Sequence, residues 1–188
     1  MEKTTRTQII ESADELFYHR GFEHTSFAHI ADEVKISRGN FYHHFKSKDE
    51  ILESVIELRL ERAKQMLDAW QTQETNPTDR IRLFIQMLIM NKSKLKLYGC
   101  PVGTLCSELA KLDHVSKKQA GKLMGTYRDW LARQFIGAGC KKNADELAMH
   151  VLAHSQGIAV LANTFQDEAF IKHEVRQMEK WLDEALGK

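Results

Sequence analysis

The chain has 188 residues, enough for a buried core in one compact unit or in a small head on a larger body. Its 27 basic and 26 acidic residues leave a formal net charge of +1, so composition alone does not indicate a nucleic-acid partner. Charged residues interrupt the apolar stretches, and residues 1–20 contain no signal-peptide core. We therefore expect a cytoplasmic protein with no membrane segment.

Three cysteines, Cys100, Cys106 and Cys140, form an odd set without the spacing of zinc ligands. Nothing in the sequence indicates export, so we expect free thiols rather than a disulfide scaffold. No cofactor or metal site is expected.

Apolar residues recur at helical spacing along nearly the whole chain, and no alternating strand pattern is present. We predict an all-α protein of about nine helices. A first helix ends at Gly21, a second begins after Thr25 or Ser26, and a third covers about residues 38–44 after Ser37, a capping residue. These three helices are short enough to form a compact head.

A fourth helix begins at the capping box formed by Ser47 and Glu50 and can continue to about Trp70. Because it is longer than an average helix, it can join the head to a larger body. Asn76 and Pro77 start the next helix, and the segment 99–101 ends it. Further helices are expected over about 102–109, 116–135 and 143–161, and the last one near the end of the chain.

The second and third helices, joined by a tight turn, have the layout of a helix-turn-helix, although a small bundle with no DNA role has similar spacing. The residues of the third helix favour DNA, because Arg38 and Asn40 can read base edges near its start. Phe41 and Phe45 can turn inward as core anchors. The residues suited to phosphate contacts are Tyr42, His43, His44, Lys46 and Lys48.

The sequence resembles the signature of the TetR family of transcriptional regulators in two segments, TSFAHIA at residues 25–31 and ISRGNFYHHFKSKDEIL at residues 36–52. The resemblance implies an all-helical homodimer whose heads enter successive major grooves of a palindromic operator, usually as a repressor released by a small molecule. It also implies a DNA-binding head at 1–48, with the signature over 4–64, and an effector-binding and dimerisation domain at 49–188. The candidate DNA-binding residues are Thr25, Ser26, Lys35, Ser37, Arg38, Gly39, Asn40, Tyr42, His43, His44, Lys46 and Lys48.

Lys35 departs from the family pattern, in which glycine is common in the turn between the second and third helices. If this residue is left-handed, lysine costs roughly 1 kcal/mol of backbone energy. Lys35 is a candidate phosphate contact, and a solvated turn lysine is the alternative.

The long helices carry aromatic, thioether and polar side chains that can line a mostly apolar effector cavity, although each of them can equally be ordinary core. The candidates are Met66, Trp70, Phe84, Met87, Leu88, Asn91, Tyr98, Tyr127, Trp130 and His154. The fourth helix is the expected lever between the head and this cavity. Cys100 and Cys106 are alternative sensors, because a thiol near a helix N-terminus can be reactive, whereas a small buried cysteine is the ordinary case.

The last two helices can pair with their copies across a two-fold axis to form a four-helix bundle. The expected interface residues are Leu147, Val151, His154, Ile158, Leu161, Ile171, Val175, Met178 and Leu182. His150 and His154 share a helix face, but a third zinc ligand is missing from the pattern.

Two other classes of function compete with a DNA-binding regulator. A cysteine hydrolase pairing Cys100 or Cys106 with His114 or His154 lacks any nucleophile-elbow or phosphate-loop sequence. A helical adaptor that binds only protein leaves the polar third helix unexplained. We therefore expect a protein that is not an enzyme and that binds double-stranded DNA.

Overall fold

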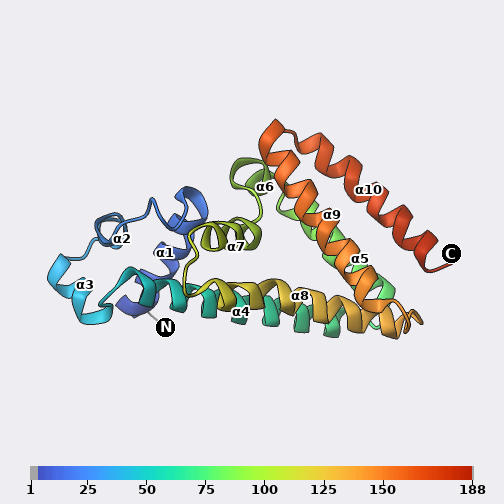
Figure 1. Cartoon of the computed structure of the whole chain (residues 1–188), viewed down its shortest axis with the longest axis horizontal. Coiled ribbons are helices and arrows are strands. Elements are labelled where there is room, and N and C mark those ends of the chain that lie inside the picture. Colours follow the sequence, from blue (N-terminus) through green and yellow to red (C-terminus); the bar gives the residue numbers. More distant parts are fainter. Residues whose placement is uncertain (1–3, 188) are drawn as a thin grey trace. The chain divides into compact units, whose positions relative to one another are not determined.

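The computed structural model describes residues 4–187, apart from the side chain of Arg38. All regular secondary structure in this range is α-helical, which confirms the expected fold class (Figure 1). The helices are α1 (Thr5–Arg20), α2 (Phe27–Val34), α3 (Arg38–His44), α4 (Lys48–Gln73), α5 (Pro77–Met90), α6 (Lys92–Tyr98), α7 (Pro101–Lys111), α8 (Lys117–Gly137), α9 (Ala144–Phe165) and α10 (Glu168–Ala185).

The ten helices of the described range exceed the expected nine by one, because the helix expected to begin at Pro77 is divided at Asn91. The backbone of Asn91 leaves the helical region, with ψ at 11°, and its side-chain amide donates to the Met87 carbonyl at 2.9 Å. Such local bonding by asparagine competes with helix continuation. Within residues 4–187, no helix is long and apolar enough to cross a membrane.

The chain folds into two compact units, each made of two stretches of sequence. The first unit contains the chain up to Arg62 together with Thr104–Leu123, and the second contains Ala63–Gly103 and Met124–Lys188. Helices α4, α7 and α8 therefore contribute residues to both units. The expected functional division at residue 48 stays a prediction.

In the first unit, each of the three N-terminal helices begins at a hydroxyl residue whose side chain caps it: Thr4 for α1, Ser26 for α2 and Ser37 for α3. Helix α1 ends at Gly21, which adopts φ of 85°, a region that favours glycine. Helix α2 ends at Lys35, which is left-handed with φ of 58° and ψ of 43°. The sharp turn expected before α3 is therefore present.

A buried ion pair joins α1 to α4 within the first unit. Asp14 accepts from the Nε of Arg59 at 2.6 Å and from a terminal nitrogen of Arg62 at 2.8 Å. Asp14 and Arg59 are both buried, so removing Asp14 would take away the carboxylate that compensates the buried Arg59 charge. The pair therefore holds α1 against α4.

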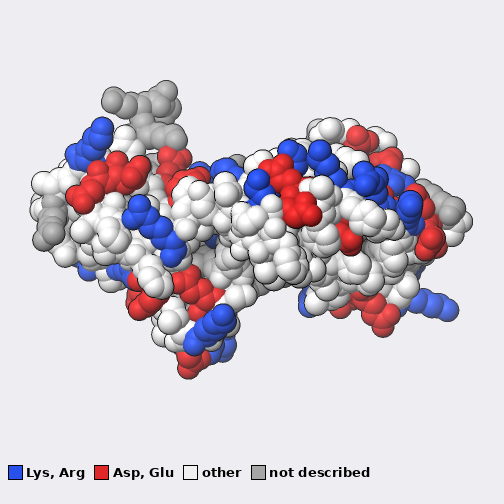
Figure 2. Space-filling model, turned by 90° about the horizontal axis from the view of Figure 1, so that it is seen from above, with Lys and Arg blue, Asp and Glu red and all other residues white. Residues whose placement is uncertain are grey.

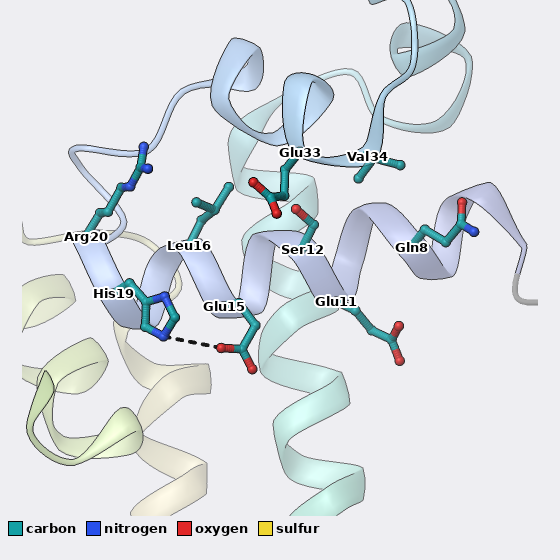
Figure 3. Close-up of a pocket in the computed structure, with 9 residues that line it drawn as sticks. All are labelled: Gln8, Glu11, Ser12, Glu15, Leu16, His19, Arg20, Glu33 and Val34. Carbon is teal, nitrogen blue, oxygen red and sulfur yellow. Dashed lines mark ion pairs between the residues drawn. The ribbon is translucent and has the colours of Figure 1, made fainter. Parts of the chain in front are cut away.

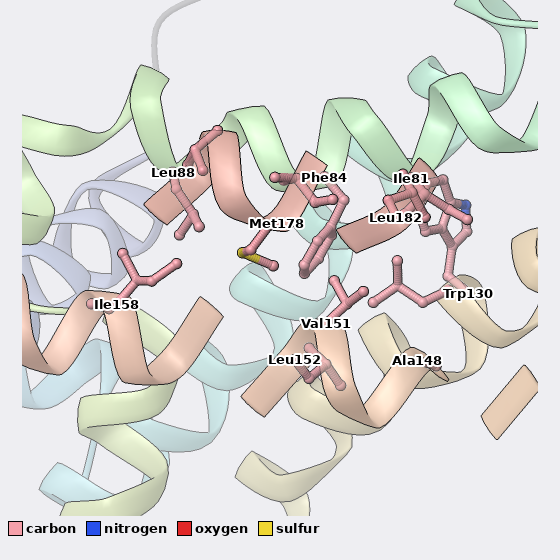
Figure 4. Packing of buried hydrophobic residues seen from close by; sticks show 14 of the residues in the cluster. Ile81, Phe84, Leu88, Trp130, Ala148, Val151, Leu152, Ile158, Met178 and Leu182 are labelled. Atoms are coloured by element: carbon pink, nitrogen blue, oxygen red, sulfur yellow. The ribbon is translucent and has the colours of Figure 1, made fainter. Parts of the chain in front are cut away.

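In the second unit, α5, α9 and α10 pack on one another around a hydrophobic core (Figure 4). Asn76 caps α5 by accepting from the Thr78 N–H at 2.8 Å, and Pro77 occupies the first turn. Gly137 packs against Pro77, because a Cβ at Gly137 would lie 2.9 Å from the proline ring. The labelled core residues in Figure 4 are Ile81, Phe84, Leu88, Trp130, Ala148, Val151, Leu152, Ile158, Met178 and Leu182.

Candidate nucleic-acid interface

Helix α3 presents two chemically different faces. Phe41 and Phe45 are each 1% exposed, as expected for its anchors, and the Phe41 ring lies 5.0 Å from that of Phe27 on α2. Asn40 and Tyr42, which flank Phe41 in the sequence, are exposed. Burial of the two phenylalanines therefore fixes α3 with its polar side chains toward solvent.

The other polar residues of α3 follow the same division. His43 is exposed and His44 is half-buried, both in the last turn of the helix. The side chain of Arg38 lies outside the described residues, although its backbone begins the helix. Of the two candidate base-reading residues, Asn40 is therefore the one whose side chain the structure describes.

The first turns of α2 and α3 carry exposed hydroxyl caps. Ser26 accepts from the His29 N–H at 3.2 Å, while Nδ1 of His29 accepts from the Ser26 N–H at 3.2 Å. Ser37 accepts from the Asn40 N–H at 3.3 Å. Because helix N-termini attract anions, these two ends are suited to phosphate contacts.

Gly39 is exposed in the first turn of α3, and a Cβ built there would meet no atom within 4 Å. Glycine destabilises a helix relative to alanine by about 1 kcal/mol. The fold itself therefore gives no reason for glycine at this position. Without a side chain at this position, an external partner can approach the helix backbone closely, which would explain the glycine.

Two predicted DNA contacts have other partners in the structure. Thr25 is 1% exposed, and its hydroxyl donates to the Gly21 carbonyl at 2.7 Å. The ammonium of Lys48 donates to the carbonyls of Phe22 and Glu23 at 2.9 and 3.3 Å. Both side chains hold the loop between α1 and α2, a role that sequence reasoning missed because the partners are backbone atoms.

Lys46 and Lys35 remain at the surface around α3. Lys46 donates from its ammonium to the Tyr42 carbonyl at 2.6 Å, and its N–H donates to Glu50 at 2.7 Å. These bonds close the C-terminal end of α3. Lys35 has a left-handed backbone, so lysine carries a conformational cost at this position, as expected.

A groove between α1 and α2 is lined by several carboxylates, unlike α3. It measures about 700 Å³ and includes Glu11, Glu15 and Glu33, and Glu15 pairs with His19 at 3.4 Å (Figure 3). Across the face drawn in Figure 2, acidic and basic side chains are interspersed. Carboxylates repel phosphate, so this groove disfavours DNA and leaves α3 as the better candidate surface.

The predicted effector-binding residues lie in three settings in the second unit. Trp70, Phe84, Leu88 and Trp130 belong to the hydrophobic core, and the Trp70 and Trp130 rings are 5.9 Å apart. Met66, Met87 and Tyr127 are partly buried against that core, and Tyr98 is half-buried. Asn91 and His154 are exposed. An effector cavity among them stays a prediction.

The two candidate sensor cysteines occupy different environments. Cys100 is half-buried just before α7, and its sulfur accepts from the Gly103 N–H at 3.4 Å. Cys106 lies within α7, and its thiol donates to the Ala120 carbonyl at 3.4 Å. The sulfur of Cys100 therefore receives a backbone N–H at the start of α7.

The predicted dimer residues need correction, because most of them are buried in the core of the protomer itself. The buried ones are Val151, Ile158, Ile171, Val175, Met178 and Leu182. Helical periodicity identified an apolar face correctly, and most of that face packs within the protomer. Leu147 is partly buried, and only His154 and Leu161 are exposed.

A different face of α9 carries exposed apolar side chains. Val160 is 62% exposed and Phe165 is 72% exposed, and Met149 and Leu161 extend the same stripe. A Cβ at Gly157, in the middle of the stripe, would meet no atom within 4 Å. We call these five residues the α9 stripe.

Next to the α9 stripe, three rings stack in the second unit. The His150 ring lies 4.6 Å from that of His154 and 4.1 Å from that of Trp181 on α10. Burial, and then the neighbouring His154, lower the pKa of His150. His150 therefore packs between His154 and an aromatic ring of the last helix.

Comparison with known proteins gives matches over both parts of the chain. The model of bacterial regulatory proteins of the tetR family matches residues 9–55, and that of the C-terminal domain of LmrA/YxaF-like transcriptional regulators matches residues 77–177. A helix-turn-helix-type transcriptional regulator in the lacX 3′ region of Lactococcus lactis subsp. lactis is 28% identical over 170 residues, 88% of this chain and 86% of that protein. The corresponding regulator YxaF of Bacillus subtilis is 24% identical over 169 residues, 87% of each chain.

Solved structures agree with these matches at the level of the fold. A TetR transcriptional regulator from Legionella pneumophila superposes with a TM-score of 0.84 at 21% identity, covering 98% of both chains. The second of the two family models spans more than half of the sequence. The chain therefore belongs to the TetR family of helix-turn-helix transcriptional regulators, a family of DNA-binding proteins rather than enzymes.

Proposed function

We propose that the protein is a cytoplasmic repressor that binds a palindromic operator as a homodimer and is released by a small-molecule effector. The observation that carries this proposal is α3, whose aromatic side is buried and whose polar side faces solvent. An exposed polar helix preceded by a sharp turn has the geometry needed to enter a major groove.

In this proposal, the residues of the head divide into two kinds of contact. Arg38 and Asn40 read base edges, because they lie in the first turn of α3. The phosphate contacts come from residues around the two helix starts and the end of α3, namely Ser26, Lys35, Ser37, Tyr42, His43, His44 and Lys46. Thr25 and Lys48 act indirectly by holding the loop that leads to α2.

The dimer is proposed to form through the α9 stripe rather than through the buried residues first expected. An exposed apolar stripe with a glycine at its centre allows two copies of one helix to approach closely across a two-fold axis. Two α3 helices would then lie about 34–36 Å apart, one turn of DNA.

Selection from randomised duplexes followed by footprinting tests the proposal. The parent protein should select a palindrome, and Asn40→Ala should relax its preference at particular positions, each worth about 1–3 kcal/mol. Gln73→Ala, at an exposed position near the end of α4, serves as the control and should return the parent consensus. A parent protein that selected no sequence would refute the proposal.

The effector is proposed to bind among the aromatic and thioether side chains of the second unit. An electrophile is the second candidate trigger, and the N–H bond received by Cys100 favours that thiol over Cys106. Treatment with N-ethylmaleimide should then release operator from the parent and from Cys106→Ser but not from Cys100→Ser. Release from all three proteins would exclude Cys100 as the sensor.

A further inference from the structure

The loop between α1 and α2 is held by two oppositely charged side chains from distant parts of the chain. The carboxylate of Glu108, on α7, accepts from the N–H groups of Phe22 and Glu23, both at 2.9 Å. The ammonium of Lys48 donates to the carbonyls of the same two residues. We call Glu108 and Lys48 the loop clamp, because together they satisfy both donors and both acceptors of one dipeptide.

The side chain of Phe22 fits into the same arrangement. It is 2% exposed, and its ring meets those of Phe17 and His114 edge-on at 5.3 and 5.2 Å. The ammonium of Lys48 lies 4.2 Å from the centre of the ring. The loop is therefore held by packing as well as by charge-assisted hydrogen bonds, which are roughly twice as strong as neutral ones.

Gly21 is fitted to the carboxylate of Glu108. Its φ of 85° favours glycine, and a Cβ at this position would lie 3.0 Å from Oε1 of Glu108. Any side chain here would therefore be strained and would press on the carboxylate. The end of α1 and the position of Glu108 are thus mutually dependent.

Helix α7, which carries Glu108, belongs to both compact units. Residues up to Gly103 lie in the second unit, and those from Thr104 lie in the first. In the second unit, Gly103 packs against the side-chain carboxamide of Gln156 on α9. A Cβ at Gly103 would overlap this carboxamide. One helix of 11 residues is therefore packed on α9 at its start and holds the loop near its end.

We propose that Glu108 is the positioning residue through which α7 couples the second unit to the DNA-reading helices, an inference that rests on the proposed DNA-binding function. The clamped loop leads directly to Ser26, the cap of α2, and α2 packs on α3 through Phe27 and Phe41. A displacement of α7 would therefore move the loop and, through α2, the reading helix. Coupling is reciprocal, so operator bound at α3 must alter the first turn of α7.

Glu108→Gln tests the coupling, because an amide has one acceptor oxygen and places its NH₂ group against the second backbone N–H. Hydrogen exchange is measured on the full chain, with and without a saturating duplex that carries the selected operator. In the parent, operator should change exchange in peptides covering residues 101–107 and 150–160. In Glu108→Gln, operator should still bind, but those changes should fall at least about threefold, and the Phe22 and Glu23 amides should exchange about tenfold faster.

Glu57→Gln, at an exposed position on α4, is the matched control and should behave as the parent. Glu108→Asp keeps the charge but shortens its reach by one methylene, so it should show the same loss and decides the question if Glu108→Gln does not fold. A residue that only stabilised the fold would lower the melting temperature without removing the operator-dependent change.

Two results overturn the coupling: a parent that binds operator without any change in α7, or Glu108 variants that keep the change. Failure of the parent to select any operator is a different result, and it refutes the proposed function instead.

Discussion

Gly39 combines a conformational cost in α3 with the absence of any neighbouring atom that requires it. Gly39→Ala should therefore stabilise the free protein by about 0.5–1 kcal/mol, because alanine is the better helix former. The added methyl group should nevertheless weaken operator binding at least about tenfold if DNA approaches the helix backbone here. Thermal unfolding and DNA titration measure the two effects.

Gly121→Ala is the matched control for Gly39, because Gly121 is also a helical glycine with open space around its Cβ position. It should stabilise the protein without changing DNA affinity. A Gly39→Ala protein that bound operator as tightly as the parent would show that α3 does not approach DNA at this residue.

Lys35 contributes two separable effects at one position. Lys35→Gly should raise the free energy of unfolding by about 1 kcal/mol, because glycine tolerates the left-handed backbone. If the ammonium also contacts phosphate, the salt dependence of DNA binding should lose about one unit of slope. Urea unfolding and binding at several salt concentrations measure these effects, and Lys35→Arg should keep the parent slope.

At the scale of residues, the sequence identified which side of α3 is buried, because Phe41 and Phe45 are four positions apart on one helix. It did not identify the roles of Thr25 and Lys48. Thr25 donates to the nearby Gly21 carbonyl, a backbone acceptor that no side-chain pattern marks. Lys48 donates to the carbonyls of Phe22 and Glu23, in a loop that is also bound by Glu108, 86 residues beyond Phe22. A local pattern contains no information about such a partner.

Helix α6 is attached to the start of α10 by one carboxylate. Hydrogen bonds from Lys92, Lys96 and Ser93 lower the pKa of Glu168 from its usual 4.5 to about 2. A lowered carboxyl pKa contributes stability that is present above pH 4.5 and is lost as the pH falls toward 2. Glu168→Gln should therefore melt at a lower temperature at pH 7 and should lose part of the pH dependence in that window.

Thermal unfolding at a series of pH values checks the role of Glu168. Glu146→Gln, at an exposed position in the first turn of α9, is the control and should leave the acid dependence unchanged. Equal melting curves for Glu168→Gln and the parent at pH 7 would show that the cluster adds nothing to the docking of α6.

At the scale of elements, helix type and most boundaries could be predicted, because capping residues such as Ser26, Ser37 and Asn76 lie where helices begin. The element against which each apolar face packs could not be predicted. Helix α9 is apolar on several sides, with Val151 in the protomer core and Val160 exposed. Periodicity identifies both faces as apolar and does not distinguish the core of one protomer from the surface between two.

The quaternary structure of the whole molecule depends on the α9 stripe in our proposal. Gly157→Leu should leave the protomer folded, since a Cβ at this position has open space around it. It should weaken the dimer by about 100-fold, because both protomers would then place a leucine side chain at the two-fold axis, where the two helices approach each other. Analytical ultracentrifugation measures the dissociation constant.

Gly121→Leu, also at a helical glycine with open space, should leave the dimer intact. Operator affinity should fall together with dimerisation in Gly157→Leu and not in the control. A Gly157→Leu protein that sedimented as the parent dimer would place the interface elsewhere.

The discontinuous first unit also bears on the order in which the protein forms on the ribosome. Helices α1 to α3 are translated before Glu108 and His114, which contact Phe22 and follow the whole of α4, α5 and α6 in the chain. The loop before α2 therefore cannot reach its final position in a nascent chain that ends before α7. Premature release of such a chain should yield a head with exposed Phe22, a substrate for chaperones and proteases rather than a shortened DNA-binding protein.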